Sequence, residues 1–299
     1  MLSDNHNKPF VSVIIPTYND NQSLETCLNA LDSQTYPKTH YEIIVVDNGS
    51  DIPPTELVQN IDNATLLSEP KKSSYAARNT GIDHAQGDIF AFIDSDCIPN
   101  TYWLENGVEH VVTSDVLVAV GGAVKVFFKN ANAPTWVELY EKVFAFPIDS
   151  VKKRYFPTCN LFTNCSTLET VGKFNENLKS GGDIDWGNRA YNKGVHLKYA
   201  ENIQILHPAR RTLKQHANKV RRIAGGQIKR AKESRTSWYL KRIVYYDFLP
   251  PIGSVRKLIT YKELNIQQKL KVFAIILWTR TVAIREKIKV GLLAKTPVR

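Results

Sequence analysis

Several short segments of this chain are almost wholly apolar and end abruptly in polar or acidic residues. The clearest are residues 10–15 (FVSVII), 41–46 (YEIIVV) and 88–93 (DIFAFI). Between them, residues 21–31 and 73–85 read as helices. Strands that are apolar on both faces and alternate with helices are typical of a mostly parallel sheet flanked by helices. The sequence therefore predicts an α/β fold.

Later segments extend this pattern. A helix over residues 183–193 is expected to end at Gly194. Beyond Pro208 the chain becomes helical and basic, which divides it into a main domain of residues 1–210 and a basic helical extension of residues 211–299. We expect further strands over residues 64–67, 117–128 (with a break at Gly121-Gly122), 158–165, 195–199 and 203–206.

The C-terminal part is far more basic than the rest of the chain. Residues 208–299 carry 23 Lys and Arg against four Asp and Glu, whereas residues 1–207 carry 16 against 25. This asymmetry favours an anionic partner, such as membrane headgroups or a lipid-linked phosphate. Nucleic acid is not expected, because the helix-turn-helix and zinc-finger signatures of DNA-binding proteins are absent from the sequence.

The extension also has features of a membrane-surface segment. Residues 211–246 combine basic with aromatic side chains, as helices on anionic membranes do. Residues 270–284 (LKVFAIILWTRTVAI) present an apolar face either to such a surface or to the main domain. The first residues, MLSDNHNKPF, lack the basic and apolar regions of a signal peptide. We expect a cytoplasmic protein, with the inner face of the cell membrane as a candidate contact, and mostly buried, reduced cysteines.

Three polar clusters follow strands of the predicted sheet: Thr17-Tyr18-Asn19, Asp47-Asn48 and Asp94-Ser95-Asp96. Ligands bind at the carboxyl ends of such strands. Asp94 and Asp96 share one side if the extended backbone continues, and paired carboxylates suit Mg²⁺ or Mn²⁺ completed by substrate phosphates. A solvated turn with capping duties is the alternative interpretation of this triplet.

Five motifs in order carry a stronger signal: VSVIIPTYN, EIIVVDNGS, SYAARNTGI, GDIFAFIDSD and GGDIDWGNRAYNKG. Over residues 9–225 the chain closely resembles family 2 glycosyltransferases of the GT-A fold. The resemblance implies transfer of a sugar, with inversion, from a nucleotide-diphosphate sugar to a hydroxyl of a glycan or lipid-linked acceptor. Assembly of cell-envelope polysaccharide or glycolipid is the expected context. No QxxRW signature of processive synthases is found, so one or a few transfers are expected.

The resemblance also implies roles for residues of the nucleotide-sugar site. In the acidic triplet, the first aspartate contacts the ribose and the last coordinates the metal. The family often has two aspartates after the second strand, whereas this chain has Asp47-Asn48, which leaves the preferred base open. The residues implied to bind the nucleotide sugar are Pro16, Thr17, Tyr18, Asn19, Asp47, Asn48, Arg78, Asp94 and Ser95.

The remaining roles concern catalysis and the metal. The resemblance makes Asp183 the base that deprotonates the acceptor, with Asp185 as second candidate, because the usual Glu-Asp pair is here Gly182-Asp183. Trp186 either stacks on the acceptor sugar or fills the core. Asp96 and His207 are the implied ligands of Mn²⁺ or Mg²⁺.

Two other functions remain open at this point. A sugar nucleotidyltransferase would normally carry a Gly-rich loop with Arg or Lys after the first strand, and IIPTYND has none. A non-catalytic nucleotide-sugar-binding protein is favoured slightly by the glutamate missing before Asp183.

Overall fold

The computed structural model describes residues 8–113, 117–146, 154–178, 180–233 and 248–292. The chain forms two compact units. Unit 1 comprises Met1–Lys125, Ile148–Asn177 and Gly182–His207, and unit 2 comprises Val126–Pro147, Leu178–Gly181 and Pro208–Arg299. Residues 1–7, and residues 234–246 of the predicted basic segment, lie outside the described residues.

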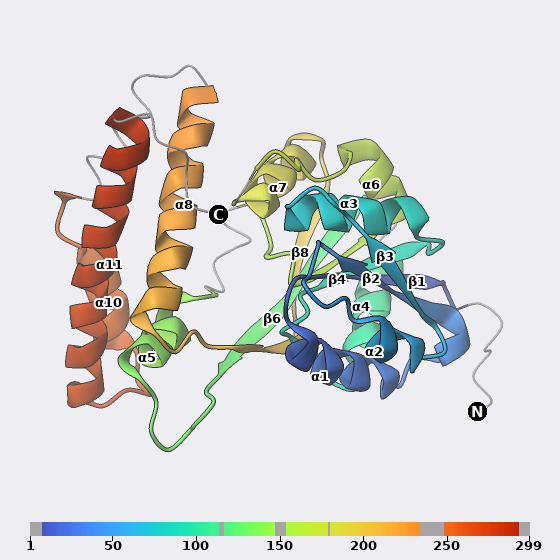
Figure 1. Ribbon diagram of the computed structural model, residues 1–299, viewed down its shortest axis with the longest axis horizontal. Coiled ribbons are helices and arrows are strands. Elements are labelled where there is room, and N and C mark those ends of the chain that lie inside the picture. The colour runs from blue at the N-terminus through green and yellow to red at the C-terminus, as the bar shows by residue number, and fades with distance from the viewer. Residues whose placement is uncertain (1–7, 114–116, 147–153, 179, 234–247, 293–299) are drawn as a thin grey trace. The chain divides into compact units, whose positions relative to one another are not determined.

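Unit 1 is built on an eight-stranded sheet in the order β3-β2-β1-β4-β7-β6-β8-β5 (Figure 1). The first four strands in this order are parallel, and the pairs β4–β7, β7–β6 and β8–β5 are antiparallel. The predicted α/β fold is thus confirmed. The strands are β1 (Val11–Thr17), β2 (Tyr41–Asp47), β3 (Ala64–Ser68), β4 (Ile89–Ile93), β5 (Ile98–Pro99), β6 (Val118–Phe127), β7 (Asn160–Asn164) and β8 (His196–Pro208).

Helices cover both faces of this sheet, as its apolar strands require. Every residue of β1 and β4 is buried, so neither face of these strands can be left to solvent. One face carries α1 (Asn21–Asp32), α2 (Thr55–Gln59) and α4 (Trp103–Val112), and the other carries α3 (Ser74–His84), α6 (Cys165–Val171) and α7 (Gly182–Asn192) (Figure 1). A 3₁₀ turn, η2 (Lys38–His40), leads into β2.

Two predicted features of the antiparallel half were wrong. β6 runs without a break through Gly121-Gly122. A Cβ at Gly121 would lie 2.0 Å from a ring carbon of Phe156, so the glycine admits a neighbouring ring and does not end the strand. The two strands expected over residues 195–199 and 203–206 form the single strand β8.

Unit 2 contains four helices among the described residues: α5 (Trp136–Phe144), α8 (Leu213–Glu233), α10 (Ile252–Thr260) and α11 (Ile266–Leu292). Its apolar core combines residues from α5, α10, α11 and the α10–α11 connection: Leu139, Val143, Leu258, Leu264, Val272 and Ile276. None of the described helices combines the length and the apolar character needed to span a bilayer.

A buried carboxylate, Glu141 of α5, organises the charges inside unit 2. Its side chain is 1% exposed and accepts from Arg210 at 3.0 Å and from Lys219 at 3.0 Å, with His216 Nδ1 at 3.6 Å. Burial alone would raise the pKa of the Glu141 carboxyl, but its contact with His216 and the charges of Lys219 and Arg210 hold that pKa below its usual range. Since these cations surround one anion, each depends on it for charge compensation.

Replacing Glu141 with Gln should therefore destabilise the protein strongly. The variant leaves Arg210 and Lys219 without a counter-charge, and we expect a loss of about 3 kcal/mol in the free energy of unfolding, measured by urea denaturation at neutral pH. The deficit should shrink below about pH 4, where the carboxylate of the unfolded wild type is already protonated and its lowered folded pKa stabilises less.

Glu263→Gln is the matched control, because Glu263 pairs with Lys142 at 2.8 Å but is 65% exposed. Its cost should stay below about 1 kcal/mol. Equal losses in the two variants would contradict the role given to Glu141.

Candidate active site

The carboxyl ends of the parallel strands bring the predicted polar clusters to one edge of unit 1. Thr17, the last residue of β1, lies opposite Asp47, the last residue of β2. β4 is paired with the other side of β1, Phe92 opposite Ile14, and Asp94 follows directly after this strand. The edge of the sheet thus offers hydroxyl, carboxylate and backbone groups to one ligand.

Asn19 ties the loop after β1 to the loop after β2. It has a left-handed backbone (φ 51°), its amide donates to Ser50 Oγ at 2.8 Å, and its side chain donates to Asp51 at 3.0 Å and accepts from the Asp51 amide at 2.8 Å. Beside it, Tyr18 is 47% exposed, while the buried Thr17 hydroxyl has no hydrogen-bond partner within the described part of the chain. The loop is held in shape and presents Tyr18 outward. Pro16 is buried within β1, opposite Val46.

Asn48 has a structural task that an aspartate could not perform. Its side-chain amide donates to the carbonyls of Glu69 at 2.9 Å and Lys71 at 2.8 Å, and it is 5% exposed. A carboxylate has no proton to donate and would face two carbonyl oxygens. The asparagine that stands in place of the family's second aspartate therefore anchors the segment after β3. Asp47 accepts from the Ser50 amide at 3.2 Å through both carboxylate oxygens.

Arg78 of α3 is paired with Asp94, the first aspartate of the triplet. The arginine is 3% exposed, its Nη2 donates to Asp94 Oδ1, and its Nη1 donates to the Ser74 carbonyl at 3.3 Å. Its buried Nε has no hydrogen-bond partner among the residues that the structure describes. Asp94 is thus held from the side of α3, and the guanidinium keeps a donor for a further acceptor. Ser95, the next residue, is buried.

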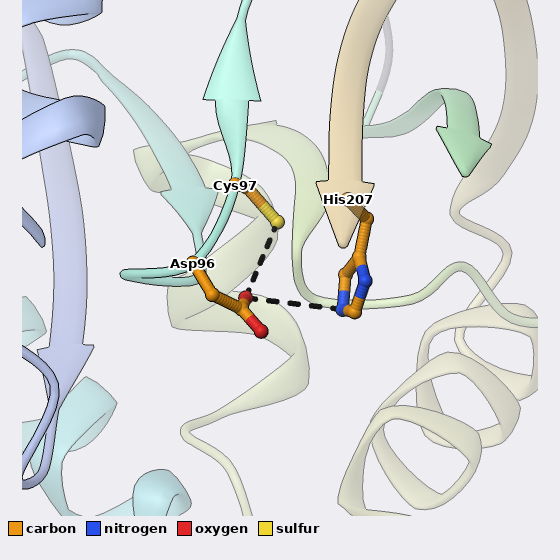
Figure 2. Close-up of side chains that lie close together, drawn as sticks. All are labelled: Asp96, Cys97 and His207. Atoms are coloured by element: carbon orange, nitrogen blue, oxygen red, sulfur yellow. Dashed lines mark hydrogen bonds and ion pairs between the residues drawn. The ribbon is translucent and has the colours of Figure 1, made fainter. Parts of the chain in front are cut away.

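Asp96 lies beside His207 at the end of β8 (Figure 2). Asp96 Oδ1 is 3.8 Å from His207 Nε2, and the thiol of Cys97 donates to the same oxygen at 3.7 Å. The three ligand atoms lie within 4.8 Å of one another. β5, which follows Asp96, pairs with β8, so the two strands bring the side chains together.

The donor set fits a divalent cation. A carboxylate oxygen and a neutral imidazole nitrogen are both accepted by Mn²⁺, whereas Mg²⁺ prefers oxygen alone. Burial and a hydrogen bond with Cys159 raise the pKa of the Cys97 thiol well above its usual value. Its soft sulfur also suits Mn²⁺ less well than a carboxylate oxygen does. Cys97 was not among the residues expected at this site. Its position next to the acidic triplet was the one available signal.

The predicted catalytic helix α7 begins close to α3. The Gly182 amide donates to the Tyr75 hydroxyl at 2.8 Å, and Asp183 follows with its carboxylate accepting from the Ile184 amide at 2.9 Å. Asp185 instead forms an ion pair with Arg189 at 3.0 Å. Of the two base candidates, Asp185 already has a charged partner on its own helix.

Trp186 lies in the core rather than at the surface. It is 2% exposed, its indole N–H donates to the Gly172 carbonyl at 2.9 Å, and its ring packs against Phe174. Of the two roles expected for this residue, the structure matches core packing, since a buried ring offers no face to an acceptor sugar.

Comparison with known proteins identifies the family. Residues 12–175 match glycosyl transferase family 2. The chain belongs to this family. Glycosyltransferase AglE of Haloferax volcanii is 40% identical over 242 residues, which make up 79% of this chain and 76% of the relative. The dolichyl N-acetyl-α-D-glucosaminyl phosphate 3-β-D-2,3-diacetamido-2,3-dideoxy-β-D-glucuronosyltransferase of Methanococcus voltae is 24% identical over 69% of this chain and 68% of its own length.

A mannosyltransferase from Pyrobaculum calidifontis, solved with GDP-Man and Mn²⁺, shares the fold of this glycosyltransferase. Its TM-score is 0.65 at 20% identity, over 97% of this chain and 89% of that one. The GT-A fold and the family 2 assignment expected from the five motifs are confirmed. Family 2 enzymes are inverting glycosyltransferases, so this is the reaction class of the chain.

Asn48→Asp tests whether the two hydrogen bonds donated by the Asn48 side chain stabilise the protein. We expect the variant to lose about 2 kcal/mol in the free energy of unfolding, because the carbonyls of Glu69 and Lys71 lose their donors and meet a negative charge. Thermal and urea unfolding would measure the loss. Asn29→Asp, at an exposed position of α1, is the control and should be nearly neutral. A fully stable Asn48→Asp variant would show that these two hydrogen bonds contribute little.

Proposed function

We propose that this glycosyltransferase is metal-dependent, with Asp96 and His207 as protein ligands and Mn²⁺ preferred over Mg²⁺. The observation that carries the proposal is the pairing of these two side chains at the strand ends beside Asp94. The mixed oxygen and nitrogen donors support the choice of metal. When bound, such an ion neutralises the charge that grows on the departing diphosphate. In this proposal Asp94 faces the ribose, and Arg78 positions Asp94 beside the diphosphate through their ion pair.

The transfer itself is a single displacement. An acceptor hydroxyl attacks the anomeric carbon, its proton passes to Asp183, and the bond from the anomeric carbon to the diphosphate oxygen breaks. The leaving group departs as the nucleoside diphosphate, and attack from the opposite face inverts the anomeric configuration. Asp183 is the base in this proposal because it stands at the position that the family pattern gives to the base, and Asp185, which forms an ion pair with Arg189, is the alternative.

The nucleotide is held, in this proposal, by the loop and strand ends of β1 and β2. Tyr18 is exposed enough to stack on a base, and the backbone and side chains of Pro16, Thr17, Asn19, Asp47 and Asn48 frame it. Because the Asn48 amide group is already used by two carbonyls, only its oxygen is left for a base edge. This favours a base that donates at that point, such as the N3–H of uracil or the N1–H of guanine.

The test is nucleoside-diphosphate release from UDP-glucose, UDP-N-acetylglucosamine and GDP-mannose, with Mn²⁺, Mg²⁺ or chelator. We expect release from at least one donor, faster with Mn²⁺. Asp96→Ala and His207→Ala should lower it by roughly 100-fold, and Asp183→Asn by a similar factor without loss of the nucleotide-induced rise in melting temperature.

Asp185→Asn is the control for the base and should retain most activity. Release that is insensitive to chelator would contradict the metal proposal. If Asp183→Asn were fully active and Asp185→Asn inactive, Asp185 would be the base and Asp183 would not.

We further propose that the acceptor is lipid-linked and that unit 2 contacts an anionic membrane surface. The name of the Methanococcus voltae relative refers to a dolichyl phosphate-linked substrate, which supports an acceptor of this class. The basic residues of the C-terminal part supply the charge complementary to phosphate headgroups.

The exposed apolar side chains of unit 2 support this contact in detail. On α11, Ile266, Leu270, Phe273 and Leu277 recur at helical spacing and are 77%, 66%, 38% and 47% exposed, while Val272 and Ile276 of the same helix are buried. On α10, Ile252 and Ile259 are 72% and 66% exposed and share a largely apolar groove with Arg256 and Phe273. We call this set the α10–α11 face. Apolar side chains next to cations are the composition of a surface that enters the headgroup region.

Vesicle flotation tests the α10–α11 face. The protein should bind vesicles of mixed phosphatidylglycerol and phosphatidylcholine, and bind less at high salt. The double variant Ile266→Ser/Leu270→Ser should bind vesicles at least about tenfold more weakly, because two apolar side chains are no longer transferred from water into the membrane surface. Ile52→Ser, at a 74% exposed position of unit 1, is the control and should bind as wild type. Equal binding by the double variant and the control would reject this surface.

A further inference from the structure

Tyr75 connects the two parts of the candidate active site. It lies one helical turn before Arg78 on α3, and the Arg78 guanidinium carbon is 5.9 Å from the centre of its ring. Its hydroxyl oxygen accepts the Gly182 amide at 2.8 Å, at the first residue of α7. One turn of α3 therefore contacts Asp94 through Arg78 and the residue before Asp183 through Tyr75.

The Tyr75 ring is fixed in place from several sides. It is 8% exposed and stacks on Phe174 at 6.2 Å between ring centres. Phe174 in turn packs against Phe92 of β4 and Trp186 of α7. A ring held in this way keeps its hydroxyl at a defined point, which a flexible side chain on the surface could not do.

Gly182 is fitted closely to this ring. A Cβ at position 182 would lie 2.6 Å from Tyr75 Cζ and within 2.8 Å of two further ring carbons. No side chain fits there unless the ring or the helix moves. The glutamate expected before the aspartate in the family pattern is therefore excluded by Tyr75, and the tyrosine hydroxyl occupies the space at the start of the helix.

We propose that Tyr75 is a positioning residue for sugar transfer, which holds the first turn of α7 and thereby sets Asp183 relative to the donor site. The inference rests on the proposed role of Asp183 as base. The first amides of a helix have no partner within the helix, and a buried one needs an acceptor from elsewhere. Tyr75 supplies that acceptor for Gly182. Through the rigid turn of α3, the same residue links the position of the base to the ion pair at Asp94.

Tyr75→Phe removes the hydroxyl and keeps the ring. In hydrogen exchange read by mass spectrometry, we expect the peptide containing Gly182 and Asp183 to exchange about tenfold faster than in the wild type. With the donor found active in the release assay, kcat should fall about tenfold while KM for the donor stays within a factor of about two. Because partial unfolding would also lower the apparent kcat at an unchanged KM, kcat is calculated per folded enzyme, with the folded fraction measured by circular dichroism. A fall that persists after this correction identifies a positioning role.

Two further variants complete the experiment. Tyr36→Phe is the matched control, because Tyr36 is also a buried tyrosine of unit 1. Its hydroxyl donates to the Pro9 carbonyl at 2.6 Å and has no part in the contact between α3 and α7. It should change neither kcat nor exchange at Gly182. Gly182→Ala leaves the Tyr75 hydroxyl intact but forces the ring and the helix apart, so it should lower kcat as Tyr75→Phe does.

Unchanged exchange at Gly182 and unchanged kcat in Tyr75→Phe would overturn the proposal. So would a donor KM that rises as much as kcat falls, because the residue would then act on donor binding. If the wild type released nucleoside diphosphate from no donor, the proposed function would fail, whereas the exchange measurement would still determine whether Tyr75 holds α7.

Discussion

The buried ion pair between Arg78 and Asp94 is the interaction on which the candidate active site depends. A guanidinium that is 3% exposed is tolerated only with a counter-charge and hydrogen-bond acceptors nearby. Asp94 supplies the charge from the end of β4, and Ser74 supplies a carbonyl. The pair thus fixes α3 against the strand end that carries the acidic triplet. Close packing supports it, since Gly81 of α3 leaves no room for a Cβ against Ile14 of β1.

The site gathers groups from both halves of the sheet. The parallel half contributes the strand ends at Thr17, Asp47 and Asp94. The antiparallel half contributes His207, which the pairing of β5 with β8 brings beside Asp96. In the proposed function, consecutive loops near the N-terminus bind the nucleotide, whereas later segments supply the base and His207, one of the two metal ligands.

Much of this arrangement could be predicted from particular residues. The apolar runs at 10–15, 41–46 and 88–93 became β1, β2 and β4 with small shifts, because only buried strands tolerate such sequences. The interruption expected at Gly121-Gly122 did not occur. Glycines in a strand pattern usually predict an interruption, but here Gly121 makes room for Phe156 and Gly122 makes room for Asn160. Neither neighbour can be inferred from the local sequence. For the same reason Trp186 stayed ambiguous until its contact with Phe174 was known.

The sequence by itself determined the fold class, the family and the order of the polar clusters, because hydrophobic periodicity and motif order are local properties of the chain. Only the tertiary structure decided which of these groups meet. Asp96 and His207, Arg78 and Asp94, and Tyr75 and Gly182 are each brought together by pairing or packing of separate elements. It also showed why position 48 carries Asn and position 182 carries Gly. Both choices depend on neighbours distant in the chain: two carbonyls that need donors, and an aromatic ring that fills the space.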